Sequence, residues 1–367
     1  MKIAFDYQIF AQQSYGGISR YYKNLAAELL KLEQKISIFA GLHRNNYLTS
    51  LPNDIVSGYK ISRYPPKTAK LFQRANHYLT NYQMKLWKPE VIHETYYSNF
   101  IPNFNHVPRI VTAHDIIHEL FSETLNKNNI ITQRKITTFN RADHIISISQ
   151  NTKKDLIEFF GISPERITVI HLGSSSLSIN GNHHSNDSNN KSFLLYVGPR
   201  AGYKNFNCFL EAVSQSKKLI DEFDIVAFGG GMLTSDEQAT IRSLGFNNGQ
   251  VKQIGGDDSV LASLYKDAIA FVYPSLYEGF GIPPLEAMAH QCPVVSSNSS
   301  SMPEVIGHAG EYFDPKEPES IKVAIENVVF SQSRIRDLKA KGLERIQVFS
   351  WQKCAKETLS IYKDIVG

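Results

Sequence analysis

The sequence predicts two α/β domains, each built around a doubly wound parallel sheet. The chain has 367 residues, enough for two domains with a core of their own. Apolar runs typical of buried strands alternate with helical patterns along most of its length. A polar segment rich in Ser, Asn, Gly and His interrupts this alternation. We therefore expect a first domain at 1–174, a linker at 175–192 and a second domain at 193–349.

The first domain opens on the apolar run 2–10, which we interpret as a buried strand. Asp6 lies inside this run and no cleavage site follows, which argues against a signal peptide. Apolar residues then recur every three or four positions, which predicts a helix over 18–32. The remaining elements are strands at 35–42, 89–97, 109–117, 142–149 and 166–173, with a helix at 151–161. Strands separated by helices of this length indicate parallel pairing.

The second domain repeats the pattern. Its expected strands are 193–198, 223–231, 250–256, 268–275 and 292–297, and a helix is expected over 319–330. Ser350 can cap an amphipathic helix over 350–367, which we expect to pack back on the first domain. Two such domains are expected to face each other across a cleft, with ligands outside the carboxyl ends of the strands.

Composition excludes several classes of protein. Charged residues make up 20% and hydrophobic residues 42% of the chain, which excludes wholesale disorder. With 22 Gly and 15 Pro it is not collagen-like, and Cys208, Cys292 and Cys354 are too few for a disulfide scaffold. No window approaches the ~20 apolar residues of a membrane span. We expect a cytoplasmic protein that is at most peripheral to the inner face of a membrane.

The net charge of +4 is unevenly distributed. Residues 1–190 hold 21 basic and 14 acidic residues, whereas residues 191–367 hold 18 and 21. Much of the excess lies in 59–88, which has seven Lys or Arg, six aromatic residues and no acidic residue. Five of these cations form a candidate acceptor or membrane patch: Lys60, Arg63, Lys67, Lys70 and Arg74.

Two interpretations of this basic stretch compete. Basic and aromatic residues suit an anionic membrane surface, where the stretch would dock the protein. Alternatively, it is a solvated basic helix whose apolar side chains pack inward, namely Leu71, Tyr78, Leu79 and Tyr82. We do not expect a nucleic-acid partner, because no base-reading motif accompanies the charge.

The segment 273–289 predicts an anion site. A strand ends there, Gly279-Phe280-Gly281 forms a turn, and Pro283-Pro284 suit the first turn of a helix. A helix N-terminus preceded by glycines lets phosphate approach free backbone N–H groups. Glu278 and Glu286 flank this turn, and carboxylates accept hydrogen bonds from sugar hydroxyls. The alternative is an ordinary strand-to-helix turn with solvated glutamates.

A second candidate phosphate element lies at 197–205. Arg200 and Lys204 follow a strand in a glycine-containing loop, where two cations could neutralise a diphosphate. Taken alone, such cations are more often surface charges, and the glycine-containing turns at both sites favour phosphate. Asp257 and Asp258 are adjacent rather than spaced as a metal-binding pair, so we expect neither a metal nor another cofactor.

Together these motifs resemble glycosyltransferase family 4, whose members are retaining enzymes with the two-domain GT-B fold. The likeness spans nearly the whole chain, including 149–161 and 301–315. Its most specific elements are the E-x7-E motif from Glu278 to Glu286, Arg200 with Lys204, the glycine loop 16–20, and His114-Asp115.

The resemblance implies roles for residues of the second domain. Arg200 and Lys204 would bind the donor diphosphate and stabilise the departing nucleotide. Glu286 would accept hydrogen bonds from the ribose. Glu278 would hold the transferred sugar together with the backbone of Phe280 and Gly281.

The remaining expected roles concern four residues. Ile282 would be a further donor-binding residue, and Ile254 would lie near the nucleotide base of the donor. Gly17 of the first domain would present its amide to phosphate or acceptor. His114 would contact the donor sugar or act as general base, since an unperturbed imidazole titrates near neutral pH.

The activity implied is transfer of a hexose from a nucleoside diphosphate sugar, with UDP-glucose expected first and GDP-mannose second. The acceptor would be a saccharide or a lipid-linked saccharide in polysaccharide biosynthesis. Two alternatives stay open, namely a nucleotide-sugar epimerase or hydrolase and a non-catalytic sugar-nucleotide scaffold. The sequence does not decide between a covalent intermediate and front-face attack.

Overall fold

The computed structural model describes residues 1–100, 104, 106–121, 130–174 and 191–367. Nearly all of the expected linker, 175–190, lies outside the described residues. The chain divides into two compact units. Unit 1 comprises Met1–Gly173 and Trp351–Gly367, and unit 2 comprises Ser174–Ser350.

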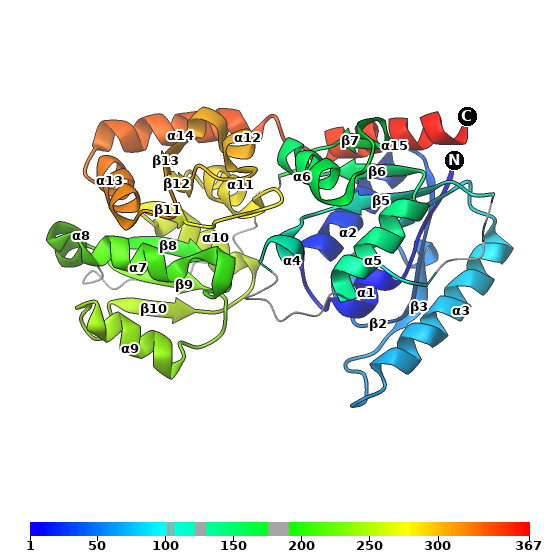
Figure 1. Ribbon diagram of the computed structural model, residues 1–367, viewed down its shortest axis with the longest axis horizontal. Coiled ribbons are helices and arrows are strands. Elements are labelled where there is room, and N and C mark those ends of the chain that lie inside the picture. The colour runs from blue at the N-terminus through cyan, green and yellow to red at the C-terminus, as the bar shows by residue number, and fades with distance from the viewer. Residues whose placement is uncertain (101–103, 105, 122–129, 175–190) are drawn as a thin grey trace. The chain divides into compact units, whose positions relative to one another are not determined.

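Unit 1 is built around a parallel sheet whose seven described strands have the order β3-β2-β1-β4-β5-β6-β7. The strands are β1 (Lys2–Phe5), β2 (Lys35–His43), β3 (Val56–Lys60), β4 (Val91–Glu94), β5 (Arg109–Ala113), β6 (His144–Ser147) and β7 (Ile167–Val169). The helices are α1 (Gln8–Gln12), α2 (Gly17–Lys31), α3 (Ala69–Trp87), α4 (Ile117–Leu120), α5 (Ile130–Arg141), α6 (Gln150–Phe160) and α15 (Trp351–Val366). Figure 1 shows α3 in light blue at the margin of the unit, next to β2 and β3.

The first apolar run is shorter as a strand than expected. β1 ends at Phe5, and Gln8–Gln12 form α1 instead of continuing the strand to residue 10. The reason is local, because the Asp6 carboxylate accepts hydrogen bonds from the backbone N–H of Gln8 (3.3 Å) and of Thr95 (2.9 Å). An Asp side chain that bonds nearby amides turns the chain away from a strand ladder.

The C-terminal helix α15 belongs to unit 1 and packs against α2. Its Tyr362 hydroxyl lies 2.6 Å from Nδ1 of His93, and the other ring nitrogen of His93 lies 2.9 Å from the Thr112 hydroxyl. His93 is completely buried, and this burial lowers its pKa to about 3. It is therefore a neutral, structural histidine that ties α15 to the middle of the sheet.

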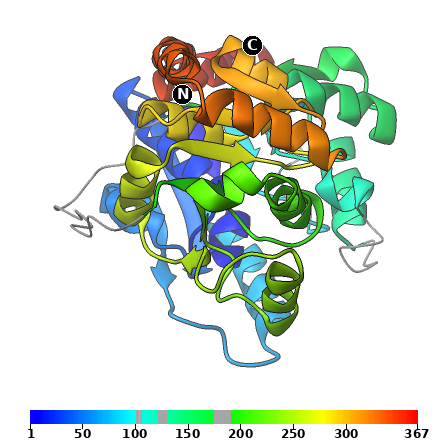
Figure 2. The same ribbon diagram turned by 90° about the vertical axis from the view of Figure 1, so that its left-hand side faces the viewer.

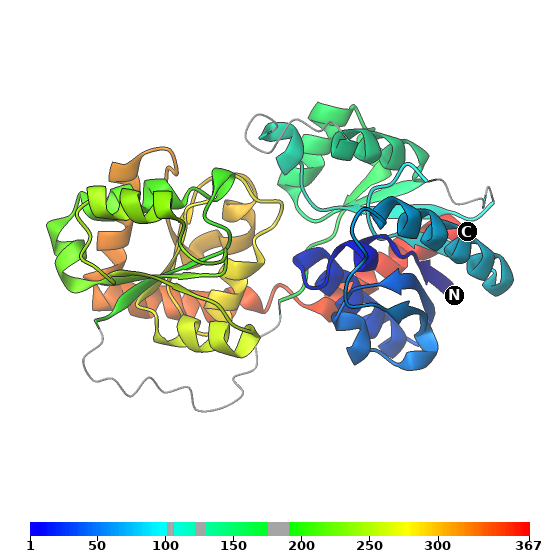
Figure 3. The ribbon, with the colours of Figure 1, turned by 90° about the horizontal axis from the view of Figure 1, so that it is seen from below.

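Unit 2 has a parallel sheet whose six described strands have the order β10-β9-β8-β11-β12-β13. The strands are β8 (Phe193–Val197), β9 (Asp224–Phe228), β10 (Val251–Ile254), β11 (Ala270–Tyr273), β12 (Val294–Ser297) and β13 (Gly310–Phe313). The helices are α7 (Phe206–Ser214), α8 (Lys217–Glu222), α9 (Ser235–Ser243), α10 (Asp258–Asp267), α11 (Ile282–Ala289), α12 (Met302–Ile306), α13 (Pro318–Val329) and α14 (Gln332–Ile346). Figure 3 shows helices on both sides of this sheet.

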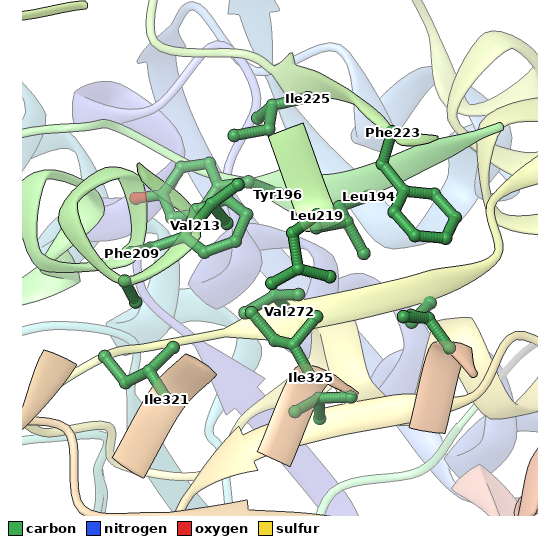
Figure 4. Packing of buried hydrophobic residues seen from close by; sticks show 14 of the residues in the cluster. Leu194, Tyr196, Phe209, Val213, Leu219, Phe223, Ile225, Val272, Ile321 and Ile325 are labelled. Atoms are coloured by element: carbon green, nitrogen blue, oxygen red, sulfur yellow. The ribbon is translucent and has the colours of Figure 1, made fainter. Parts of the chain in front are cut away.

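The core of unit 2 lies between the sheet and the helices α7, α8 and α13. Figure 2 shows α7 in green and α13 in orange next to each other, and Figure 4 shows the side chains beneath them. Leu194 and Ile225 from the sheet meet Phe209 of α7 and Ile325 of α13, and all four are fully buried. The two-domain α/β fold predicted from the sequence is thus confirmed.

Each sheet reverses its strand order once, and these points position the candidate site residues. In unit 2 the reversal lies between β8 and β11, and in unit 1 between β1 and β4. Loops that leave the carboxyl ends of such strands diverge and leave room for a ligand.

Candidate active site

The loops after β8 and β11 bring two predicted site residues into direct contact. Nζ of Lys204 lies 2.6 Å from Oε1 of Glu278, and both side chains are about nine-tenths buried. Lys204 also donates to the Tyr273 hydroxyl at 3.3 Å and lies 5.2 Å from the centre of that ring. The cation and the carboxylate are therefore held at the strand-order reversal of unit 2.

Arg200 lies in the same loop but is bound within the protein. Its side chain is 3% exposed and makes an ion pair with Glu237 at 2.7 Å. Its terminal nitrogens donate to the carbonyls of Gly229 (3.0 Å), Gly231 (3.0 Å) and Met232 (3.1 Å). Arg200 therefore clamps the loop between β9 and α9, a contact that the sequence analysis did not foresee.

The loop that Arg200 contacts has an unusual backbone. Gly229, Gly230 and Gly231 all have positive φ angles, of 87°, 70° and 74°. Glu237 takes part in a capping box with Thr234 at the start of α9, and hydrogen bonds from Arg200 are the main cause of its lowered pKa. An ionised Glu237 therefore anchors one side of Arg200 while the three glycines surround the other.

The turn before α11 is held from the neighbouring segment. The Ser300 hydroxyl accepts from the backbone N–H of Glu278 at 2.9 Å. The Ser301 hydroxyl donates to the carbonyls of Glu278 (2.9 Å) and Phe280 (3.0 Å). Gly281 has φ 100° and precedes α11, and a Cβ there would lie 2.5 Å from the Met302 side chain. The turn therefore has a fixed shape that requires glycine at this position.

The other donor-side residues lie on α11 and at the end of β10. Ile282 is the first residue of α11, and Glu286 lies one turn further along and is buried. Ile254 is the last residue of β10, at the carboxyl end of the strand next to β9.

Gly17 and His114 belong to unit 1. Gly17 begins α2, and a Cβ added there would meet no atom within 4 Å. The protein itself therefore does not require glycine at this position. His114 follows β5 and its backbone N–H donates to the Tyr97 hydroxyl at 3.3 Å.

The ionisation of His114 favours one of its two expected roles. Burial is the main cause of its lowered pKa, which falls to about 4, with Asp115 opposing the shift. Its Nε2 atom is buried without a hydrogen-bond partner. At neutral pH the ring is therefore uncharged and has an open site for a hydrogen bond, which suits contact with a hydroxyl.

The basic stretch forms α3 and the segments that lead to it. The expectation that its apolar side chains pack inward is wrong, because Leu71, Tyr78 and Tyr82 are 66%, 72% and 64% exposed and Leu79 is 36% exposed. The helix packs on the sheet through a different face, which carries Asn76, Thr80 and Met84. Lys60, Arg63, Lys67, Lys70 and Arg74 are all exposed, as expected for a surface patch.

The arrangement in unit 2 suits one kind of chemistry. The start of α11 supplies positive charge where the loops diverge, and Lys204 can stabilise charge on a departing phosphate by exchanging its bond to Glu278 for a phosphate oxygen. Within the described ranges, no three His, Cys, Asp or Glu side chains group so as to hold a metal ion. In that same part of the chain, no helix has the length and apolar character needed to span a membrane.

Comparisons with known proteins agree with this geometry. Residues 15–174 match the family model described as Glycosyltransferase Family 4, and residues 181–345 match Glycosyl transferases group 1. The chain is 30% identical over 277 residues to the O-antigen chain mannosyltransferase B of Escherichia coli, covering 71% of this chain and 73% of that protein. The chain belongs to glycosyltransferase family 4. It is therefore a glycosyltransferase, as the sequence analysis expected.

Two further relatives extend the comparison. The serotype-specific mannosyltransferase WbdA of Escherichia coli is 29% identical over 284 residues, which cover 72% of this chain but only 34% of that longer protein. The sucrose-phosphate synthase structure from Thermosynechococcus elongatus aligns with a TM-score of 0.79 at 18% identity, covering 99% of this chain and 98% of that one. At that identity the likeness concerns the fold alone.

The site also contains residues that the sequence analysis missed. Glu237, Tyr273, Ser300 and Ser301 all touch predicted site residues. Their signals in the sequence were weak, because a Glu three residues after a Thr is a common helix start and serines are frequent in loops. Only the strand order shows that they converge.

Proposed function

We propose that this chain transfers a mannosyl group from a nucleoside diphosphate sugar to a saccharide or lipid-linked saccharide in polysaccharide biosynthesis. The observation that carries the proposal is the pairing of Lys204 with Glu278 at the strand-order reversal of unit 2. The relative at 30% identity supports the sugar, because it is a mannosyltransferase. We therefore place GDP-mannose ahead of UDP-glucose, the reverse of the order expected from the sequence alone.

The proposed step needs positive charge at the leaving group. As the bond between the sugar and the diphosphate breaks, negative charge develops on the departing phosphate. Lys204 and the N-terminus of α11 supply compensation without a metal. Glu278 and the rigid turn to Gly281 hold the sugar, and Glu286 accepts from the ribose. We propose retention at the anomeric carbon, in keeping with the family resemblance.

Acceptor-dependent product formation tests the proposal. The purified chain is incubated with GDP-mannose or UDP-glucose, with and without an oligosaccharide acceptor, and products are analysed by mass spectrometry and NMR. We expect an acceptor enlarged by one hexose, in the α configuration, with GDP-mannose as the better donor. An epimerised or hydrolysed donor without acceptor product favours the alternative enzyme class, and nucleotide-sugar binding without turnover favours a scaffold.

We further propose that α3 docks unit 1 on an anionic membrane surface. Leu71, Tyr78, Tyr82 and Leu86 are separated by seven, four and four positions, so they form one stripe along the exposed side of the helix. Arg74 and Lys85 lie along one edge of this stripe and are exposed. An apolar stripe beside cations matches the interface of a bilayer with anionic lipids.

Vesicle flotation tests this docking. The chain should float with vesicles that contain phosphatidylglycerol and remain behind with phosphatidylcholine alone. Combined replacement of Leu71, Tyr78 and Tyr82 by Ser should abolish flotation. The matched control replaces Phe159 and Met232 by Ser, because these apolar side chains are exposed elsewhere. Equal loss in both variants, or no flotation of the wild type, would contradict the proposal.

A further inference from the structure

Unit 1 contains a cavity of about 660 Å³ outside the carboxyl ends of β1 and β2. Tyr7 and Gln8 reach it directly after β1, and Arg44 directly after β2. The segment 63–67 and the start of α3 form its other walls. Neither the expected site residues of unit 2 nor Gly17 and His114 line this cavity.

The cavity is strongly cationic. Five of its lining residues are basic, namely Arg44, Arg63, Lys67, Lys70 and Arg134, and none of its described lining residues is acidic. Arg44 is fixed in place because it donates to the carbonyls of Ala11 (3.3 Å) and Gln12 (2.6 Å). Five like charges around one space repel one another, and an anion bound there would relieve this repulsion.

The start of α3 adds to this positive potential. Its first residues, Ala69 and Lys70, line the cavity, and the N-cap residue Thr68 makes no side-chain capping bond. Backbone N–H groups in the first turn of a helix have no partner within the helix and attract anions. The helix is 19 residues long, so its dipole is fully developed.

A buried amide at the cavity wall has an unused acceptor. Gln8 is 4% exposed and lines the cavity, and its Nε2 donates to Asp6 at 2.7 Å. Its Oε1 atom has no hydrogen-bond partner. A buried carbonyl oxygen without a donor is costly, and a phosphate cannot relieve it because phosphate oxygens are themselves acceptors. A sugar hydroxyl can.

Aromatic rings supply a surface for the same ligand. The Tyr64 ring stacks on Phe72 with a centroid distance of 4.8 Å and lies beneath the Arg44 guanidinium at 5.2 Å. The Tyr7 and Tyr64 hydroxyls donate to backbone carbonyls, so both rings are held in place. These fixed rings give the cavity an apolar wall beside its cations, which a sugar next to its phosphate can contact.

We propose that this cavity binds a glycosyl phosphate or diphosphate, with the phosphate on the cations and a sugar hydroxyl donating to Gln8. Because this rests on the proposed function, the ligand is the phosphate-bearing end of the acceptor. The cavity meets α3 at Ala69, Lys70, Gln73 and Asn76, on the side of the helix away from the exposed stripe, so the membrane-docking proposal and the cavity proposal are independent.

Titration calorimetry on the full chain tests the cavity. The probes are a hexosyl diphosphate with a short alkyl chain, inorganic pyrophosphate and the unphosphorylated hexose. All titrations use a Lys204→Ala background, to weaken binding at the candidate donor site. We expect the hexosyl diphosphate to bind best, pyrophosphate less well and the free hexose least, with affinities for both anions that fall as salt rises.

Two sets of variants make the test specific. Arg63→Ala with Lys70→Ala should weaken both phosphate probes by about tenfold or more, since charge-assisted contacts are lost. The matched control, Lys35→Ala with Lys154→Ala, removes two exposed cations of unit 1 that do not line the cavity, and should leave affinity unchanged. Gln8→Met should weaken the hexosyl diphosphate but not pyrophosphate, with melting temperatures recorded for each variant.

The outcomes separate this proposal from the proposed function. The cavity is not a binding site if the cavity variants bind the phosphate probes as tightly as the wild type does. The same conclusion follows if the cavity and control variants lose equal affinity. Two kinds of vesicle distinguish an acceptor from a bulk lipid headgroup: one contains a polyprenyl-linked hexosyl diphosphate, and the other contains phosphatidylglycerol alone. Preferential binding to the phosphatidylglycerol vesicles overturns the acceptor assignment. Cavity-dependent binding without any sugar transfer would leave the site intact and contradict the proposed function instead.

Discussion

The structure predicts that Arg200 matters for stability as well as activity. Replacing it by Ala removes an ion pair with Glu237 and leaves the carbonyls of Gly229, Gly231 and Met232 without their donor. Breaking a buried pair by removing one partner typically costs about 3–5 kcal/mol. Since Glu237 retains some solvent contact, we expect the lower end, about 3 kcal/mol. This should lower the melting temperature of unit 2 by about 6–12 °C.

Scanning calorimetry of the full chain measures this loss. Glu237→Gln is the informative companion, because it can keep part of the capping box but leaves the buried Arg200 guanidinium without a carboxylate, so it should also cost about 3 kcal/mol. Combining the two substitutions should cost less than their sum, because the residues are in contact. If Arg200→Ala abolished sugar transfer while the melting temperature stayed within about 1 °C of wild type, Arg200 would act on the donor alone and the clamp would be wrong.

Two further predictions concern a pair of glycines and one histidine. Gly281→Ala should destabilise unit 2 by at least about 1–2 kcal/mol because of its left-handed backbone, whereas Gly17→Ala should leave melting unchanged, so that any lost activity reports a ligand at its amide. Between pH 6.5 and 4 only the unfolded chain binds a proton at His114, so wild-type unfolding free energy should fall by about 3 kcal/mol over this range because of His114. His114→Asn should not show this part of the acid destabilisation. An unchanged acid-unfolding curve would contradict the buried, neutral His114.

Local patterns predicted the repeating elements of the fold because each pattern is set by its own residues. The helix expected over 151–161 appears as Gln150–Phe160, capped by Ser149 and ended by Gly161 in a left-handed conformation. The expected strand 2–10 ends at Phe5, because the Asp6 carboxylate accepts a hydrogen bond from the backbone N–H of distant Thr95, which competes with strand continuation. Hydrophobicity alone does not reveal such a non-local partner.

The candidate site shows the same division. Sequence spacing placed Glu278 and Glu286 around a turn before a helix, and the structure has that turn. Sequence spacing could not show that Arg200 forms an ion pair with Glu237, 37 residues later, because that contact requires β8 and β9 to be neighbours. Nor could helical periodicity alone decide which apolar face of α3 meets the sheet, since both faces carry apolar residues.

Nucleoside diphosphate binding tests the central claim, that Lys204 and Glu278 form the donor site, most directly. Calorimetric titration with GDP should give an affinity that falls about tenfold or more in Lys204→Ala, since one charge-assisted contact is lost. Lys217→Ala, an exposed lysine of α8, should bind GDP as the wild type does, and circular dichroism should show both variants folded. Unchanged GDP affinity in a folded Lys204→Ala variant would contradict the account.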